Sequence, residues 1–113
     1  MKIPELIIIG DAEEVEGGIN VVEDKDGRPS IAIQIISNLD DFSYDSNNGV
    51  IRRDREGPGQ DMVYLSRTER VLTIFHNGFK PKEVILRQVG IIAKPSSVWK
   101  IEVSGYTQEA LNT

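Results

Sequence analysis

Hydrophobic and polar residues alternate along much of this chain, and alternation is the period of a β-strand. The clearest case is Ser30–Ser37, in which three isoleucines at odd positions share one face, opposite Ala32 and Gln34. Val98–Val103 alternates in the same way, with Trp99 on its apolar face. Because successive side chains of a strand point to opposite faces, both segments are predicted to be strands with one face in a core.

Other apolar stretches predict further strands. Asp61–Ser66 and Arg70–His76 are apolar on both faces, which is typical of central, well-covered strands. Asp11–Gly18 holds four acids and a glycine pair and predicts a loop. Thr107–Asn112 predicts one helical turn or a frayed tail. Shorter strands are expected at Ile3–Ile9, Ile19–Val22, Phe42–Tyr44, Val50–Arg55 and Lys82–Arg87.

Turn sequences separate these segments. Each pairs Asp or Asn, whose side chain bonds its own backbone, with Gly, which adopts positive φ. The turns are Asp26-Gly27, Asn48-Gly49 and Asn77-Gly78. The predicted fold class is therefore all-β, a small antiparallel β-sandwich of about seven to nine strands, immunoglobulin-like or fibronectin-like. We expect residues 1–105 to form a single domain, followed by a C-terminal tail at 106–113. The predicted core positions are Ile33, Ile35, Leu72, Ile74, Val84, Leu86 and Trp99.

Composition narrows the picture mainly by exclusion. With 113 residues, 39% hydrophobic and 27% charged, the chain suits one ordered domain rather than a disordered or membrane-spanning one. Leu6–Ile9 is far shorter than the ~20 apolar residues of a transmembrane helix, and the start lacks the pattern of a signal peptide. The protein then stays inside the cell, or the chain begins after a leader. A net charge of −5 argues against nucleic acid as a partner. With no cysteine, disulfides and thiolate chemistry are excluded, and the redox compartment stays open.

The lone histidine is the first candidate for chemistry. His76 stands at the end of a predicted strand, just before Asn77-Gly78, where it could serve as a general base. No Gly-x-Ser-x-Gly motif or cysteine nucleophile accompanies it, so a half-exposed histidine beside a turn is the preferred interpretation. A hydrolytic role would require His76 to converge with at least two of Asp24, Asp26, Asp40, Asp41 and Asp45.

Acidic residues fall in three groups. Asp24–Gly27 begins like a calcium loop, but Arg28 and Pro29 follow where more oxygen ligands are needed, so a hairpin turn is favoured. Paired carboxylates could hydrolyse glycosides across a cleft, but no pattern brings the acids together, and we expect solvated loop residues. No metal or cofactor and no catalytic residue is assigned. The other two groups are Asp40, Asp41 and Asp45, and Glu13, Glu14 and Glu16.

Arginines form the one basic concentration of the chain: Arg52, Arg53, Arg55, Arg67 and Arg70. Alternation places Arg53 and Arg55 on one strand face and Arg52 on the other. Such a strand either carries charge to discourage edge-to-edge aggregation or binds an anionic partner such as a polysaccharide or an acidic protein, and the first reading is favoured.

Aromatic residues offer one more candidate surface. Four of them could form a platform for sugars, although the strand patterns around Trp99 and Phe75 favour packing in the core. They are Trp99, Tyr64, Phe75 and Phe79.

The segments between Gly59 and Gly105, from Val63–Ser66 through His76–Pro81 to Val98–Gly105, resemble the PEGA-type domains of Bacteroidetes surface and envelope proteins. The likeness extends from Gly59 to Gly105, and the strand before it, Ile31–Ile36 with its Asp26–Pro29 approach, fits as well. The Pro-Glu-Gly-Ala tetrapeptide is absent, with Glu56–Gly59 near its place, so the chain resembles a divergent member. The matching segments are Val63–Ser66, Arg70–Ile74, His76–Pro81, Val84–Leu86 and Val98–Gly105.

The resemblance implies a PEGA-like β-sandwich without enzymatic activity, one module of a longer cell-envelope or extracellular bacterial protein. Such a module would act as a spacer, an anchor or a protein-binding or glycan-binding surface. Other modules of the parent protein are then expected partners, and an oligomer is compatible with this reading. An alternative is a filament, pilus or phage-type structural subunit that donates its strand Ile3–Ile9 to a neighbour. A small hydrolytic enzyme using His76 has the least support. Arg52–Arg55 and Asp40–Asn48 are the first places to look for a binding surface.

Overall fold

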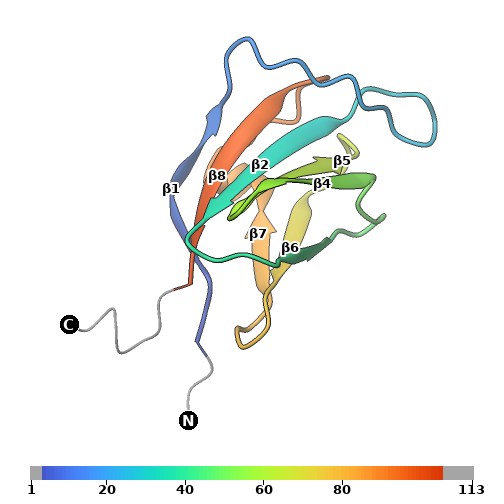
Figure 1. Cartoon of the computed structure of the whole chain (residues 1–113). Coiled ribbons are helices and arrows are strands. Elements are labelled where there is room, and N and C mark those ends of the chain that lie inside the picture. The colour runs from blue at the N-terminus through green and yellow to red at the C-terminus, as the bar shows by residue number, and fades with distance from the viewer. Residues whose placement is uncertain (1–3, 106–113) are drawn as a thin grey trace.

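Two β-sheets packed face to face make up the structure, a computed structural model that describes residues 4–105 (Figure 1). The larger sheet has the strand order β1-β8-β2-β5-β4, and the smaller one has the order β3-β6-β7. Helix is limited to one 3-10 turn, Leu86–Val89, in this part of the chain. The predicted fold class, a small all-β sandwich of seven to nine strands, is confirmed, except that one strand pair, β2 with β8, is parallel rather than antiparallel. The strands are β1 (Ile7–Glu14), β2 (Ile31–Ser37), β3 (Ser43–Asp45), β4 (Arg52–Gly57), β5 (Gln60–Leu65), β6 (Val71–Phe75), β7 (Lys82–Ile85) and β8 (Val98–Ser104).

The core lies between the inner faces of the two sheets. β2 and β8 run parallel in the centre of the larger sheet, with Ile33 beside Trp99 and Ile35 beside Ile101, and every other strand pair is antiparallel. All seven predicted core residues are at most 5% exposed. β5 and β6 lie inside their sheets, as predicted, but only alternate residues of each are buried.

The chain closes one side of the sandwich by moving from one sheet to the other. The N–H of Lys80 donates to the carbonyl of Pro4 (3.0 Å), so the start of the chain first runs beside the β6–β7 hairpin. From Ile7 the chain pairs with β8 instead. Leu6, between these two pairings, is 1% exposed. The predicted strand Ile3–Ile9, from its residue 4 onward, therefore packs against its own domain.

Two local predictions at the start of the chain were wrong. Asp11–Gly18 is a loop only in its second half, because β1 continues to Glu14 with its acids facing solvent. Ile19–Val22 belongs to no strand, although its apolar residues alternate. The predicted turn or tail at Thr107–Asn112 lies outside the described residues.

Strand limits elsewhere differ by a few residues from the prediction. The strand expected at Val50–Arg55 runs from Arg52 to Gly57, and the one expected at Lys82–Arg87 ends at Ile85, where the 3-10 turn begins. Within residues 4–105, no helix has the length and apolar character needed to span a membrane.

Candidate functional site

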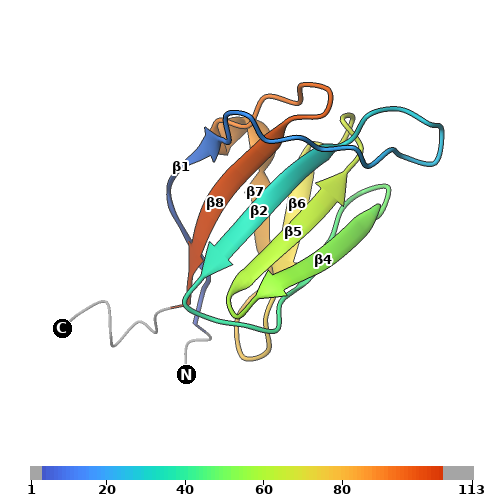
Figure 2. The same ribbon diagram turned by 45° about the horizontal axis from the view of Figure 1, so that its top comes forward.

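The edge of the larger sheet opposite β1 is β4 (Figure 2). On the same side of the sandwich, β3 is an edge strand of the smaller sheet. Among residues 4–105, β4 pairs only with β5, so its other edge is free. The prediction that Arg52–Arg55 forms an edge strand is confirmed. We call this region the β3–β4 rim, and its residues are Asp40, Phe42, Tyr44, Arg52, Arg53, Arg55 and Asp61.

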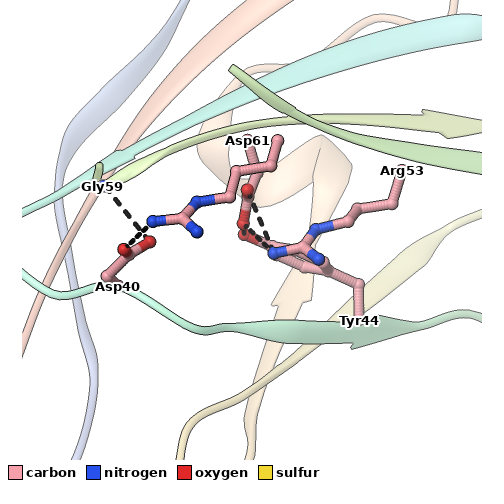
Figure 3. Close-up of polar contacts among 6 residues, drawn as sticks. Asp40, Tyr44, Arg53, Gly59 and Asp61 are labelled. Carbon is pink, nitrogen blue, oxygen red and sulfur yellow. Dashed lines mark hydrogen bonds and ion pairs between the residues drawn. The ribbon is translucent and has the colours of Figure 1, made fainter. Parts of the chain in front are cut away.

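A buried carboxylate lies at the centre of the rim. Asp61, on β5, is 3% exposed. The Nη2 of Arg53 donates to both of its carboxylate oxygens (3.1 Å each), and the hydroxyl of Tyr44 donates to Oδ2 (2.6 Å) (Figure 3). A charge out of water is tolerated when it is paired and hydrogen-bonded in this way. Burial, together with the hydrogen bond to Asp61, raises the pKa of Tyr44 above its usual value.

A second ion pair lies beside the first. Arg55 donates to the carboxylate of Asp40, which also accepts from the N–H of Gly59 at 3.3 Å (Figure 3). The N–H groups of Asp41 and Gly59 and the Arg55 guanidinium hold the pKa of Asp40 below its usual value. Gly59 has φ +68°, and a Cβ there would clash with the Ser37 carbonyl oxygen, so only glycine fits this turn.

The other face of β4 carries a separate pair. Arg52 donates from Nε to Asp54 (2.8 Å) and lies over the ring of Tyr64, 5.8 Å from its centre. Arg53 lies over the ring of Tyr44 at 5.9 Å.

A shallow groove of about 340 Å³ runs between β3 and β4. Its lining combines aromatic, aliphatic and guanidinium groups: Phe42, Ser43, Tyr44, Val50, Arg52 and Arg53.

A buried acid that the sequence did not reveal holds the turn next to the rim. Glu69 is 4% exposed and accepts from the hydroxyl of Ser46 and from the N–H groups of Asn47 (3.1 Å) and Asn48 (2.9 Å). Its carboxylate thus fixes the Ser46–Gly49 turn. Nothing in the local sequence distinguishes Glu69 from an exposed acid, because its partners lie more than 20 residues away in the chain.

His76 stands apart from the acids that a hydrolytic site would need. Its ring lies between Phe42 and Phe79, with centroid distances of 5.1 and 5.3 Å, and its Nδ1 contacts the Asn77 carbonyl at 2.9 Å. In the described part of the chain, no hydrogen bond or ion pair joins His76 to an acid. The structure therefore places it as a partly exposed side chain beside the Asn77-Gly78 turn.

The Asp24–Gly27 segment is a hydrogen-bonded turn. Oδ1 of Asp24 accepts from the N–H groups of Asp26 and Arg28 (2.9 Å each), and Gly27 has φ +76°. The N–H of Arg28, followed by that of Asp26, lowers the pKa of Asp24. A groove of about 560 Å³ lies between this turn and residues 48–51. No group of three or more His, Asp or Glu side chains within residues 4–105 is placed to hold a metal ion.

The remaining candidates are dispersed over the surface and the core. Glu13 pairs with Lys100 (3.5 Å) and Glu14 with Lys94 (3.0 Å) along β1. Trp99 is buried and donates its indole N–H to Ser97 Oγ (3.0 Å), so the aromatic residues do not form one platform. Asp45, Asp41, Glu16, Arg67 and Arg70 form no ion pair among the described residues.

Comparison with protein-family models, with curated proteins and with solved structures finds no match to this chain.

Proposed function

We propose that the chain is a non-enzymatic structural or binding module and that its partner docks on the β3–β4 rim. The observation that supports this most directly is the free edge of β4 beside a groove lined by aromatic and guanidinium groups. The two segments singled out by sequence, Arg52–Arg55 and Asp40–Asn48, meet there through Arg55–Asp40 and through Tyr44 and Arg53 on Asp61.

An extended segment of a partner protein, with acidic side chains, fits the chemistry of the rim. A free edge supplies N–H and C=O groups for a further strand, whose acidic side chains on one face would meet Arg55 and on the other face Arg52. Arg52 and Arg55 are half-exposed or more, and such surface pairs contribute little to stability, so their guanidinium groups can change partners at small cost. Arg53 stays with the buried Asp61 and keeps the site in shape.

The likeness to PEGA-type domains supports a place for this module in a longer cell-envelope or extracellular protein. In that setting the module would hold position as a spacer or anchor while the rim contacts a protein or a glycan. The absence of a nucleophile motif in the sequence and the aromatic surroundings of His76 favour a surface role over hydrolysis.

The test combines binding and turnover. Synthetic peptides of valine and glutamate that carry glutamate on both strand faces, and acidic oligosaccharides as a second arm, are titrated into ¹⁵N-labelled protein. We expect the peptides to shift the amides of β4 and β3, and the double variant Arg52→Glu/Arg55→Glu to lose this response. Lys94→Glu, a charge change beside Glu14 of β1 on the opposite side of the sandwich, serves as the control.

Two results would contradict the proposal. One is peptide shifts that appear away from β3 and β4, or that survive in Arg52→Glu/Arg55→Glu. The other is turnover of ester, glycoside or peptide substrates by the wild type that disappears in His76→Ala.

A further inference from the structure

Two aliphatic side chains project from the surface in the connection between β1 and β2. Ile19 is 85% exposed and Val21 is 83% exposed. The residue between them is buried: Asn20 donates to the carbonyl (2.9 Å) and hydroxyl (3.0 Å) oxygens of Ser30 and accepts from the N–H of Val22 (3.0 Å). This anchor fixes the backbone so that both neighbours point outward. We call Ile19 and Val21 the aliphatic ridge.

The structure also contains an apolar groove of about 640 Å³ where β7 leads through the 3-10 turn toward β8. Its apolar lining includes Ile85, which is 41% exposed, and Ile92, which is 62% exposed. Arg70 and Arg87 also line it, and neither forms an ion pair with any residue in 4–105. The groove therefore offers aliphatic surface beside two arginine side chains that form no ion pair within residues 4–105.

The ridge and the groove are complementary in apolar character and in charge. The ridge is aliphatic and is flanked by the exposed acids Glu16 and Glu23, whereas the groove is aliphatic and is flanked by two arginines. Glu69 also lines the groove, but its carboxylate is occupied by the Ser46–Gly49 turn. Each feature leaves apolar side chains in water, and contact between them would remove both from water.

We propose that the aliphatic ridge of one copy docks into the groove of a second copy. The connections that carry the two features, β1–β2 and β7–β8, lie at the same end of the sandwich, the upper end in Figure 2, where β1 and β7 finish and β2 and β8 begin. One partner can then present its groove to the ridge and its ridge to the groove, which gives a closed two-fold dimer. The contact is smaller than a standard permanent interface, so the dimer is weak and reversible. It uses a surface separate from the β3–β4 rim.

Sedimentation across a range of concentrations tests the dimer. We expect reversible monomer–dimer exchange between about 10 μM and about 1 mM. The double variant Ile19→Ser/Val21→Ser should raise the dissociation constant at least tenfold, since each fully buried aliphatic side chain corresponds to about tenfold or more in affinity. Both side chains are exposed in the monomer, so folding is preserved. Ile9→Ser, an exposed aliphatic on β1, should leave the constant unchanged. A wild type that stays monomeric throughout, or equal effects of Ile9→Ser and the ridge variant, would overturn the proposal.

Complementary variants identify the surfaces. The ¹⁵N-labelled ridge variant keeps its groove, and unlabelled Arg70→Gln/Arg87→Gln keeps its ridge. Mixing them should shift amides at 85–93 of the labelled chain. A mixture of labelled and unlabelled ridge variant contains no ridge and should give no such shifts. Unlabelled Arg52→Gln, which keeps its ridge and changes a charge outside the groove, should shift the same amides when it replaces the groove variant. Shifts confined to other strands, or shifts that persist with no ridge in the mixture, would show that the ridge does not occupy this groove.

Discussion

On the β1 side of the sandwich the gap between the sheets is filled with aliphatic side chains, whereas on the β4 side it is filled with charged and phenolic groups. Leu6 is buried between the sheets, and Ile8 and Ala12 pack against the same core. On the opposite side, Asp61 is held by Arg53 and Tyr44. Burial of apolar area needs no specific partner, but a buried carboxylate depends on each of its donors.

The aliphatic β1 side closes the core, whereas the charged β4 side is suited to contact with a binding partner. The burial of aliphatic side chains on the β1 side is insensitive to salt and presents no ion pair that a polar partner could replace. Ion pairs at the β4 side can be weakened by salt and can be replaced by groups of another molecule. Replacing one group at a time on each side measures how far this contrast holds.

The largest effect is expected on the aliphatic side. Leu6→Ala should lower the free energy of unfolding by about 3 kcal/mol, because a fully buried leucine leaves a cavity when it is truncated. Urea unfolding followed by Trp99 fluorescence measures the loss. Ile9→Ala, an exposed aliphatic on the same strand, is the control and should change stability by no more than about 0.5 kcal/mol. Equal losses in the two variants would mean that β1 does not close the core.

The second-largest effect on stability is expected from removing the buried charge of Asp61. Asp61→Asn should lower the free energy of unfolding by about 2 kcal/mol, because Arg53 loses its ionic partner while its own partial exposure limits the loss. Asp54→Asn removes a carboxylate from the exposed pair with Arg52 and should cost much less. If both substitutions had the same effect, the carboxylate of Asp61 would be no more important to the fold than a surface charge.

Tyr44→Phe should have a smaller effect that depends on pH. At neutral pH the loss is about 1 kcal/mol, the usual contribution of one hydrogen bond. Because the pKa of Tyr44 is raised in the folded state, the unfolded chain loses this proton first, and stability falls as pH rises above about 10. Urea unfolding between pH 8 and pH 11 should therefore show a flatter pH dependence for Tyr44→Phe than for the wild type. Equal pH dependence in the two proteins would contradict a raised pKa of Tyr44 in the folded state.

The smallest effect is expected at Arg55. Arg55→Ala should lower the melting temperature by at most ~2 °C, since its pair with Asp40 is exposed.

The lowered pKa of Asp40 stabilises the folded state at pH values above the usual carboxyl range, and this contribution is lost as pH falls through the folded-state pKa. The N–H groups of Asp41 and Gly59 remain in the variant. A carboxyl titration by NMR should therefore find the Asp40 pKa still below its usual value, and a complete return to that value would show that Arg55 alone lowers it.

Alternation and turn residues were sufficient to predict the fold class and the core. Ile33, Ile35 and Trp99 were placed correctly because a half-buried strand leaves a period of two in the local sequence. The same rule failed at Ile19–Val22, where the alternating residues point to solvent and the polar Asn20 points inward. Local pattern records which side chains share a face, but it does not record which face meets the other sheet.

The candidate site was predicted only in part. The arginines of β4 and the Asp40–Asn48 segment were recognised by their charge, and the edge position of β4 followed from it. Their meeting point, Asp61, was counted as part of a central strand, and the role of Glu69 was not foreseen. Both acids are defined by partners from other strands or turns, so their burial depends on contacts that no short window of sequence contains.

The parallel pairing of β2 with β8 affects the order of events during folding. β8 is the last strand of the described chain, yet it lies between β1 and β2, with Ile7 opposite Ser104 and Ile33 beside Trp99. The larger sheet therefore cannot be completed on the ribosome until the final strand has left the exit tunnel. Until then β1 has no partner strand in that sheet, and one edge of the isoleucine-rich strand β2 is unpaired. Unpaired strand edges promote aggregation. Folding that depends on contacts between the two ends of the sequence is also slow for a domain of this size.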